Sequence, residues 1–177
     1  SYGRFAAMIA TSTVVMYGIM YLNTYALDHV RFSQTRLWMA LVMGAAMAVV
    51  MLAFMLPMYR SRRANVAVAA AAALVFGGSL WLARSQQTVG EIAYMEAMIP
   101  HHSIAILTSE RARIRDPRVR LLADRIIEAQ VREIGEMERL VAELGRQPPP
   151  ADAPELLSYR KRGDPPPPPA RRAARRA

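Results

Sequence analysis

The chain of 177 residues carries a net charge of +9, is 53% hydrophobic and lacks cysteine. The lack of cysteine excludes disulfides, thiolate metal sites and cysteine nucleophiles. Residues 1–83 hold six arginines and one acidic residue, whereas residues 84–145 hold nine arginines and ten acidic residues. Because this second segment is nearly neutral, a nucleic-acid-binding face is not expected there, and we expect no nucleic-acid partner.

Three long apolar stretches predict an all-α membrane domain over residues 1–83. They cover about residues 5–27, 37–59 and 64–83. A helix needs roughly 20 apolar residues to cross a bilayer, and helices of a small soluble domain have a polar face. We therefore expect three transmembrane helices in contact with the lipid bilayer.

The arginines that flank these stretches predict the topology. The tight loop between the second and third stretches carries Arg60, Arg62 and Arg63. Basic loops of this kind remain on the cytoplasmic side. We therefore expect a three-pass protein of the bacterial inner membrane, with a cytoplasmic N-terminus and with residues from 84 onward in the periplasm.

The segment 84–145 predicts an antiparallel helical hairpin. Helical periodicity runs over residues 91–113 and 118–144, with a short connection between them. Asp116 suits the N-cap of the second helix and Pro117 suits its first turn. Because the connection is short, the two helices should be antiparallel neighbours.

The remaining segment, residues 146–177, is rich in proline and arginine. A segment with so little apolar surface cannot form a core, and its proline runs favour an extended conformation. We therefore expect a disordered tail.

The first helix of the hairpin carries a histidine on its apolar stripe. At about 100° per residue, Met95 and His102 share one stripe with neighbouring isoleucines, and Met98 lies at its edge. His101 points to the side and Glu96 points away. The stripe therefore places one imidazole where an apolar side chain is expected.

Pro100 falls inside the same helical pattern. Within a helix, proline lacks the N–H that would bond to the carbonyl of Glu96, and it kinks the helix. Such a kink would open the helix beside His102, and local distortions often accompany functional sites. Alternatively, a new helix begins at Pro100.

The second helix has polar groups in the middle of its apolar stripe. The stripe comprises Val119, Leu122, Ile126, Met137, Val141 and Leu144. Gln130 and Glu133 interrupt it. Folding the hairpin about its turn places His102 opposite Gln130 and Met98 opposite Glu133, in adjacent layers. Burying an imidazole and a carboxylate without partners is costly, so they must pair with each other or with a bound group.

These side chains form a candidate metal site. The candidate ligands are Met95, Met98, His101, His102, Glu133 and Met137, with Gln130 and Glu96 as supporting groups. Thioether sulfur and imidazole form a soft-to-borderline donor set that suits Cu(I). Zinc would favour thiolates or more histidines, and the Glu-x-x-His motif of di-iron bundles is absent. The residues alone leave two interpretations open, a metal site and a structural His–Glu pair.

The stretches MEAMIPHHSIAI and DPRVRLLADRIIEAQVREIGEMERL resemble the family known as domain of unknown function 305. The resemblance spans roughly residues 90–144. It implies a ferritin-like helical fold and, as in some members, a copper ion bound in the periplasm. Many copper-handling members are secreted, have two hairpins and are richer in methionine and histidine. One hairpin on three spans fits a single copper site that holds, senses or passes an ion.

The competing interpretation is a non-catalytic subunit whose hairpin docks on a membrane partner. The pair of His102 and Glu133 would then fix the packing of the hairpin without a metal. In either case we expect no enzymatic activity, because no nucleophile–base–orienter arrangement is present. The hairpin has too little core to be stable alone, so we expect a homodimer or a membrane partner protein.

Overall fold

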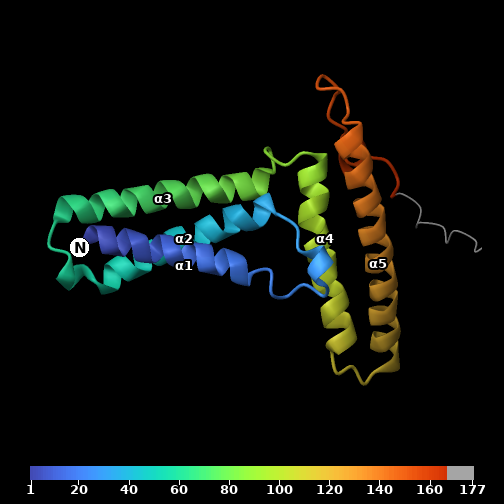
Figure 1. Cartoon of the computed structure of the whole chain (residues 1–177), viewed down its shortest axis with the longest axis horizontal. Coiled ribbons are helices and arrows are strands. Elements are labelled where there is room, and N and C mark those ends of the chain that lie inside the picture. The colour runs from blue at the N-terminus through green and yellow to red at the C-terminus, as the bar shows by residue number, and fades with distance from the viewer. Residues whose placement is uncertain (167–177) are drawn as a thin grey trace, which may run out of the picture. The chain divides into compact units, whose positions relative to one another are not determined.

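The computed structural model describes residues 1–166, in which all regular secondary structure is helical. Residues 1–146 form one compact unit and residues 147–177 a second. The first unit contains α1 (Tyr2–Ile19), α2 (Gln34–Phe54), α3 (Arg62–Ser85), α4 (Glu91–Arg111) and α5 (Pro117–Arg146), as Figure 1 shows. Two short 3₁₀ helices, η1 (Leu27–His29) and η2 (Leu56–Met58), lie in its connections. The all-α prediction is therefore confirmed for the described residues.

The second unit contains one short helix, α6 (Tyr159–Arg162), within the segment predicted to be a disordered tail. The last part of that segment, residues 167–177, lies outside the described residues. The predicted tail therefore includes a local helical turn, in which the backbone N–H of Arg162 donates to the carbonyl of Ser158 at 3.1 Å.

Two helices among the described residues, α2 and α3, are long and apolar enough to be possible membrane spans. They match the second and third predicted stretches. The first stretch differs, because α1 ends at Ile19 instead of continuing to Leu27. An 18-residue helix is about 27 Å long, slightly shorter than the roughly 30 Å hydrocarbon core. The residues after α1 form turns and η1, so the predicted span over residues 5–27 has the wrong end.

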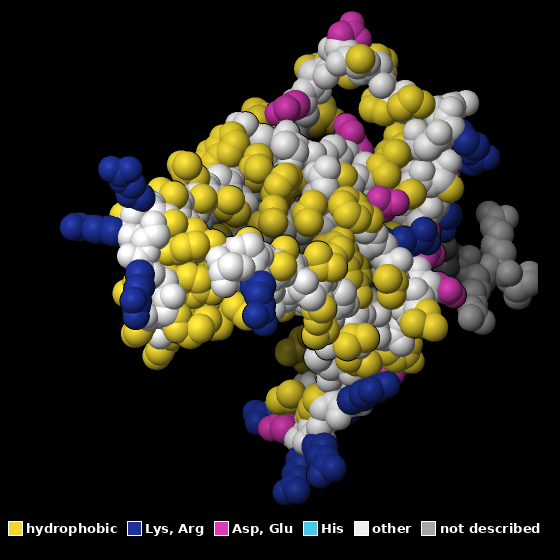
Figure 2. Space-filling view, turned by 60° about the vertical axis from the view of Figure 1, so that its left-hand side comes forward, with side chains coloured by type: hydrophobic (Ala, Val, Ile, Leu, Met, Phe, Trp, Pro, Cys, Tyr) yellow, Lys and Arg dark blue, Asp and Glu magenta, His cyan; other side chains and the backbone are white. Residues whose placement is uncertain are grey.

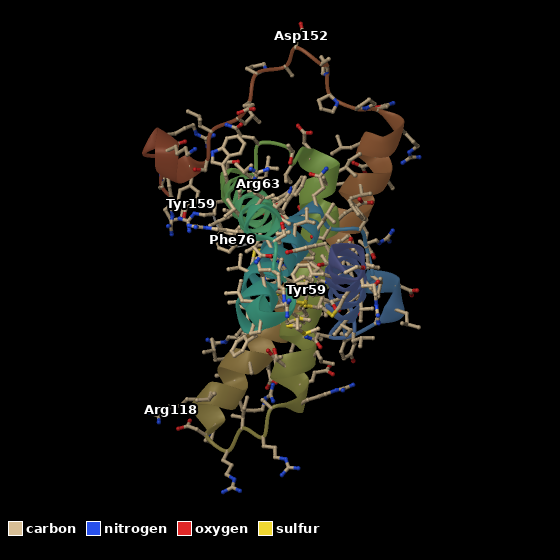
Figure 3. The ribbon with its side chains drawn as sticks, turned by 90° about the vertical axis from the view of Figure 1, so that its left-hand side faces the viewer. Tyr59, Arg63, Phe76, Arg118, Asp152 and Tyr159 are labelled. Atoms are coloured by element: carbon tan, nitrogen blue, oxygen red, sulfur yellow. The ribbon has the colours of Figure 1, made fainter. Side chains whose placement is uncertain are left out.

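The three N-terminal helices pack around α2. A buried cluster joins them and consists of Phe5, Ala48, Leu52, Tyr59 and Ala72. Figure 3 shows Tyr59 directed among these helices. Small residues on α2 allow close approach, and a Cβ atom at Gly44 would collide with the hydroxyl of Thr13 on α1. The Tyr2 hydroxyl donates to Asn65 Oδ1 at 2.8 Å, which places the start of α1 beside the start of α3.

The predicted hairpin is confirmed, and α4 and α5 form it with bounds close to those expected. Pro117 is the first residue of α5. The carboxylate of Asp116 accepts the backbone N–H of Arg118 at 2.8 Å and pairs with its guanidinium at 2.7 Å, so Asp116 acts as the predicted N-cap. Figure 3 shows Arg118 at this turn. Pro100 is buried inside the continuous helix α4, so the alternative that a helix begins there is wrong.

The core of the hairpin uses a different face of α5 from the one predicted. Ile99 and Ile106 of α4 pack with Ile134, and Ile127 and Met137 cover this cluster. The side chains of the predicted stripe remain exposed over the first half of α5, with 48% for Val119, 57% for Leu122 and 36% for Ile126. The apolar surface of α5 is wider than one partner helix can cover, and α4 packs on the neighbouring row.

The N-cap predicts a pH dependence of stability. The hydrogen bonds from the side chain and the backbone N–H of Arg118 hold the pKa of the Asp116 carboxyl below its usual range. A lowered folded-state pKa stabilises the protein above the unfolded pKa, and this stabilisation is lost as the pH falls through the folded pKa. We expect the thermal unfolding midpoint of the full chain in detergent to fall on acidification, and to fall less in Asp116→Asn.

The matched control is Asp124→Asn, because Asp124 is an exposed carboxylate in the interior of α5 that pairs with Arg120 at 2.8 Å. This variant should keep the pH dependence of the unmodified chain. A pH profile of Asp116→Asn that coincides with that of the unmodified chain would contradict the prediction.

Candidate functional site

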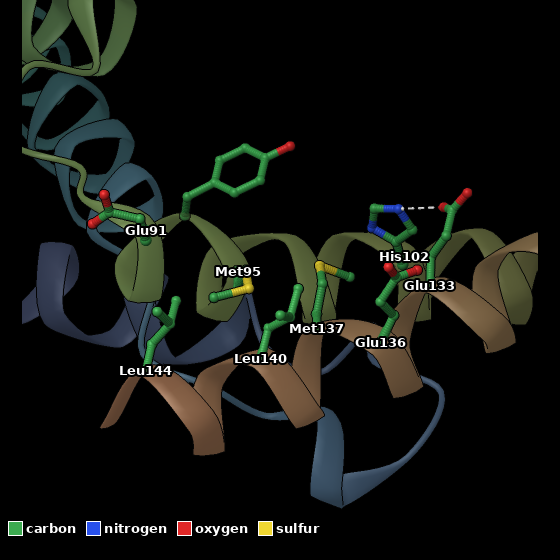
Figure 4. Close-up of a pocket in the computed structure, with 9 residues that line it drawn as sticks. Glu91, Met95, His102, Glu133, Glu136, Met137, Leu140 and Leu144 are labelled. Carbon is green, nitrogen blue, oxygen red and sulfur yellow. Dashed lines mark hydrogen bonds and ion pairs between the residues drawn. The ribbon is translucent and has the colours of Figure 1, made fainter. Parts of the chain in front are cut away.

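A groove of about 470 Å³ lies between α4 and α5 (Figure 4). It is lined by Glu91, Tyr94, Met95, His102, Glu133, Glu136, Met137, Leu140 and Leu144. The groove therefore brings together four of the six predicted ligands, namely Met95, His102, Glu133 and Met137. Helical spacing explains this, because residues three, four or seven positions apart share one side of a helix.

The imidazole of His102 lies between two oxygen acceptors. Its Nε2 atom is 3.0 Å from Glu133 Oε2, and its Nδ1 atom is 2.8 Å from the carbonyl oxygen of Met98. A neutral imidazole has one N–H donor, whereas the imidazolium has two. Both contacts are satisfied together when His102 is an imidazolium facing the Glu133 carboxylate, or when Glu133 carries the second proton.

The two side chains of this pair differ in their exposure to solvent. The side chain of His102 is 13% exposed and that of Glu133 is 45% exposed. The carboxylate therefore sits at the mouth of the groove and is partly hydrated, while the imidazole lies inside. Charge-assisted hydrogen bonds are stronger than neutral ones, so this contact joins α4 to α5 at the open side of the hairpin.

The same geometry suits a metal ligand. Metal-binding histidines commonly donate one ring N–H to a carbonyl oxygen, which fixes the ring and leaves the other nitrogen for the ion. Here Nδ1 of His102 is hydrogen-bonded to the Met98 carbonyl, and Nε2 faces the groove. An ion at Nε2 would replace the proton there and would compete with Glu133 for that position.

The available donors determine which ions fit. In residues 1–166 no group of three or more His, Cys, Asp or Glu side chains is placed to hold a metal ion. Any site in the groove therefore depends on the thioethers of Met95 and Met137 together with His102. Met95 is 6% exposed, so its sulfur is shielded from water. Two thioethers and one imidazole fit a soft ion such as Cu(I) and do not fit Zn²⁺, Ca²⁺ or Mg²⁺.

Four predicted residues lie elsewhere. His101 is exposed, and its ring centroid is 6.0 Å from that of His102. The side chains of Met98, Glu96 and Gln130 are half-buried and do not line the groove. His102 contacts Glu133, the pair that the metal-free interpretation predicted, whereas folding the hairpin about its turn placed His102 opposite Gln130. Gln130 and Glu133 are three positions apart and share one side of α5, so the difference is an offset along the helix axis.

Three lining residues were not predicted from the sequence, namely Glu91, Tyr94 and Glu136. The signal was available for Glu136, because it follows Glu133 by three positions and therefore shares its side of α5. The two others begin α4 one turn before Met95, in a segment that the motif-based analysis did not assign to the site.

Another side of α4 contacts the loop between α1 and α2. Ser103 is fully buried, and its hydroxyl accepts the backbone N–H of Tyr25 at 2.7 Å and lies 2.9 Å from His29 Nδ1. The Tyr25 hydroxyl also donates to Glu110 at 3.3 Å. These bonds hold α4 against the loop at the residue next to His102. Sequence analysis missed this contact, although the third histidine of the chain was a possible signal.

Comparisons with known proteins agree with the motifs in this hairpin. Residues 91–174 match the family described as Domain of unknown function (DUF305). An uncharacterized protein of Acanthamoeba polyphaga mimivirus is 42% identical over 62 residues, which cover 34% of this chain and 41% of that protein. The matched segment thus covers less than half of that relative. No solved structure matches the chain. The segment 91–174, which contains the groove between α4 and α5, is a DUF305 domain.

Proposed function

We propose that this chain is a membrane-anchored, non-catalytic protein that holds, senses or passes a single copper ion. The observation that carries the proposal is the placement of His102 Nε2 in a groove that also contains the side chains of Met95 and Met137. Figure 4 shows both thioethers on the same side of the hairpin as the imidazole. The donor types suit Cu(I), whose preference for sulfur and nitrogen exceeds its preference for oxygen.

Each residue has a defined role in this proposal. His102 supplies the nitrogen ligand, and Met95 and Met137 supply sulfur. The Met98 carbonyl fixes the ring through the hydrogen bond to Nδ1. Glu133 holds Nε2 in the ion-free state and becomes a nearby negative charge when an ion takes its place. His101 is exposed, so we assign it no ligand role within one chain.

The groove is proposed to face the periplasm, with α1, α2 and α3 in the bacterial inner membrane. This topology is supported by the contact between Tyr2 and Asn65, which brings the N-terminus and the α2–α3 turn to the same end of the bundle. The arginines Arg60, Arg62 and Arg63 flank that turn, which favours a cytoplasmic position for this end. The hairpin is bonded to the loop between α1 and α2, at the other end.

A second candidate function is a structural subunit without a metal. The direct contact of His102 with Glu133 favours it, because a paired imidazole and carboxylate satisfy each other and can fix how two helices pack. In that case the hairpin would dock on a membrane partner, and the thioethers would serve only as packing groups.

We further propose that two copies of the chain associate through their hairpins. Apolar side chains on one side of α5 are left uncovered in one copy, with 57% exposure at Leu122 and 40% at Leu140. Two hairpins facing each other would complete a four-helix, ferritin-like bundle. The groove beside Met137 would then be covered by the second copy, which would exclude water from the ion.

The copper proposal predicts a hierarchy of variants. In a competition titration of the full chain with a Cu(I) chelator, His102→Ala should abolish binding, and Met95→Leu with Met137→Leu should weaken it by more than about tenfold, since it removes two of three ligands. Glu133→Gln should weaken binding moderately. Affinity should also fall on acidification, because the ion displaces a proton from Nε2.

The matched controls are His101→Ala, which removes an imidazole outside the groove, and Met39→Leu, which removes an exposed thioether from α2. Both should bind copper like the unmodified chain. Equal affinity of the unmodified chain and of His102→Ala would refute the copper site and leave the structural pair as the better interpretation.

The association of hairpins is testable because the chain has no native cysteine. A cysteine introduced as Leu122→Cys should form a disulfide-linked dimer under mild oxidation in membranes, since two copies would meet along this surface. Glu128→Cys is the control, because position 128 lies on a different side of α5. Equal amounts of dimer from both variants, measured on non-reducing gels, would argue against the proposed interface.

A further inference from the structure

A second groove, of about 400 Å³, lies between α2 and α3 near the turn that joins them. Its lining consists of Val49, Leu52, Ala53, Leu56, Arg60, Arg62, Asn65, Val66 and Ala69. The apolar members come from the helices, and the two arginines come from the turn and the first residue of α3. The groove thus combines an apolar wall with a cationic end.

The cationic end has no carboxylate to neutralise it. Residues 1–83 contain one acidic residue, Asp28, and it lies in η1 between α1 and α2, at the opposite end of these helices. The ion pairs found in the described part of the chain involve other arginines. Figure 2 shows basic side chains gathered at this end of the molecule, beside a hydrophobic surface, with acidic side chains only over other parts of the visible face.

The side chain of Asn65, the third polar residue of the groove, already has hydrogen-bond partners within the protein. Asn65 donates from Nδ2 to the carbonyl of Tyr59 at 2.8 Å and accepts the Tyr2 hydroxyl at Oδ1, also at 2.8 Å. These bonds tie Asn65 to α1 and to the backbone of the turn at Tyr59, so the backbone around the arginines is held in place. The groups left to bind a ligand are therefore the guanidinium groups of Arg60 and Arg62.

We propose that this groove binds one anionic phospholipid, with its phosphate between Arg60 and Arg62 and an acyl chain along the apolar wall. The proposal rests on the membrane location proposed above and not on copper binding. A guanidinium binds phosphate oxygens through two parallel N–H donors. Basic pockets between transmembrane helices bind anionic headgroups, whereas the cationic amine of a zwitterionic lipid would be repelled by the arginines.

The apolar wall distinguishes a lipid from a free anion. Val49, Leu56 and Val66 are 45%, 50% and 62% exposed, and contact with an acyl chain removes such surface from water or from disordered lipid. A small soluble phosphate would use the arginines alone and would gain nothing from this wall. The whole lining, taken together, therefore fits a ligand with one anionic end and one apolar chain.

The test uses the full chain in mild detergent and native mass spectrometry. It is titrated with phosphatidylglycerol and, separately, with phosphatidylcholine that has the same acyl chains. Phosphatidylglycerol should bind at least about tenfold more tightly, the scale expected for two basic contacts to an anionic lipid. Replacing both arginines, as Arg60→Gln with Arg62→Gln, should remove this preference.

The matched control is Arg4→Gln with Arg63→Gln, which removes the same charge from exposed positions outside the groove. This pair should keep the preference for phosphatidylglycerol. Ala53→Phe fills the groove along its apolar wall without changing the charge, and it should also weaken lipid binding. This variant tests the lipid site if the double arginine variant does not fold.

Three results would overturn the proposal. Equal losses in the two double arginine variants would mean diffuse attraction by the basic end of the protein. Unchanged binding in Ala53→Phe would exclude an acyl chain in the groove. Competition by glycerol phosphate as strong as that by the lipid would indicate a site for a free anion. A failed copper titration, in contrast, would leave this proposal unaffected.

Discussion

The position of the His102 imidazole between the Met98 carbonyl and the Glu133 carboxylate is the constraint on which the account depends. The bond within α4 sets the direction of the ring, and the contact with α5 sets how closely the two helices approach at the groove. Both contacts are hydrogen bonds only when a second proton is present on the pair. In the copper proposal, the ion would take the place of the proton on Nε2.

The adjacent residue connects this site to the N-terminal helices. Ser103 lies about 100° around α4 from His102 and bonds to the loop between α1 and α2 through Tyr25 and His29. One turn of α4 therefore contacts both α5 and the loop between α1 and α2. Pro100 belongs to the same turn and is fully buried, and its missing N–H leaves the carbonyl of Glu96 without its usual helical partner. The motif of proline, two histidines and serine thus concentrates the contacts of the hairpin in one place.

Sequence patterns predicted the features that depend on local chemistry. Apolar length indicated α2 and α3, periodicity indicated α4 and α5, and Asp116 with Pro117 marked the start of α5 correctly. The presence of His102 and Met95 on one stripe also followed from helical spacing. These predictions succeed because each rests on residues within a few turns of one another.

The errors arose where distant segments decide the outcome. The chain leaves α1 at Ile19 and bonds to Ser103 six residues later, at Tyr25, and no local pattern encodes that contact. The rotation of α5 depends on which of two neighbouring apolar rows α4 covers. Since both rows are apolar, periodicity alone does not distinguish them. Folding the hairpin about its turn placed Gln130 opposite His102, whereas Glu133 contacts it, because the periodicity of neither helix encodes their offset along the axis.

X-ray absorption spectroscopy of the full chain loaded with one equivalent of Cu(I) tests the central claim most directly, because it identifies the atoms around the ion. The account predicts two sulfur scatterers from Met95 and Met137 and one imidazole nitrogen from His102, with the imidazole signal lost in His102→Ala. A spectrum with only nitrogen and oxygen scatterers, or with the contribution of two imidazoles, would contradict it.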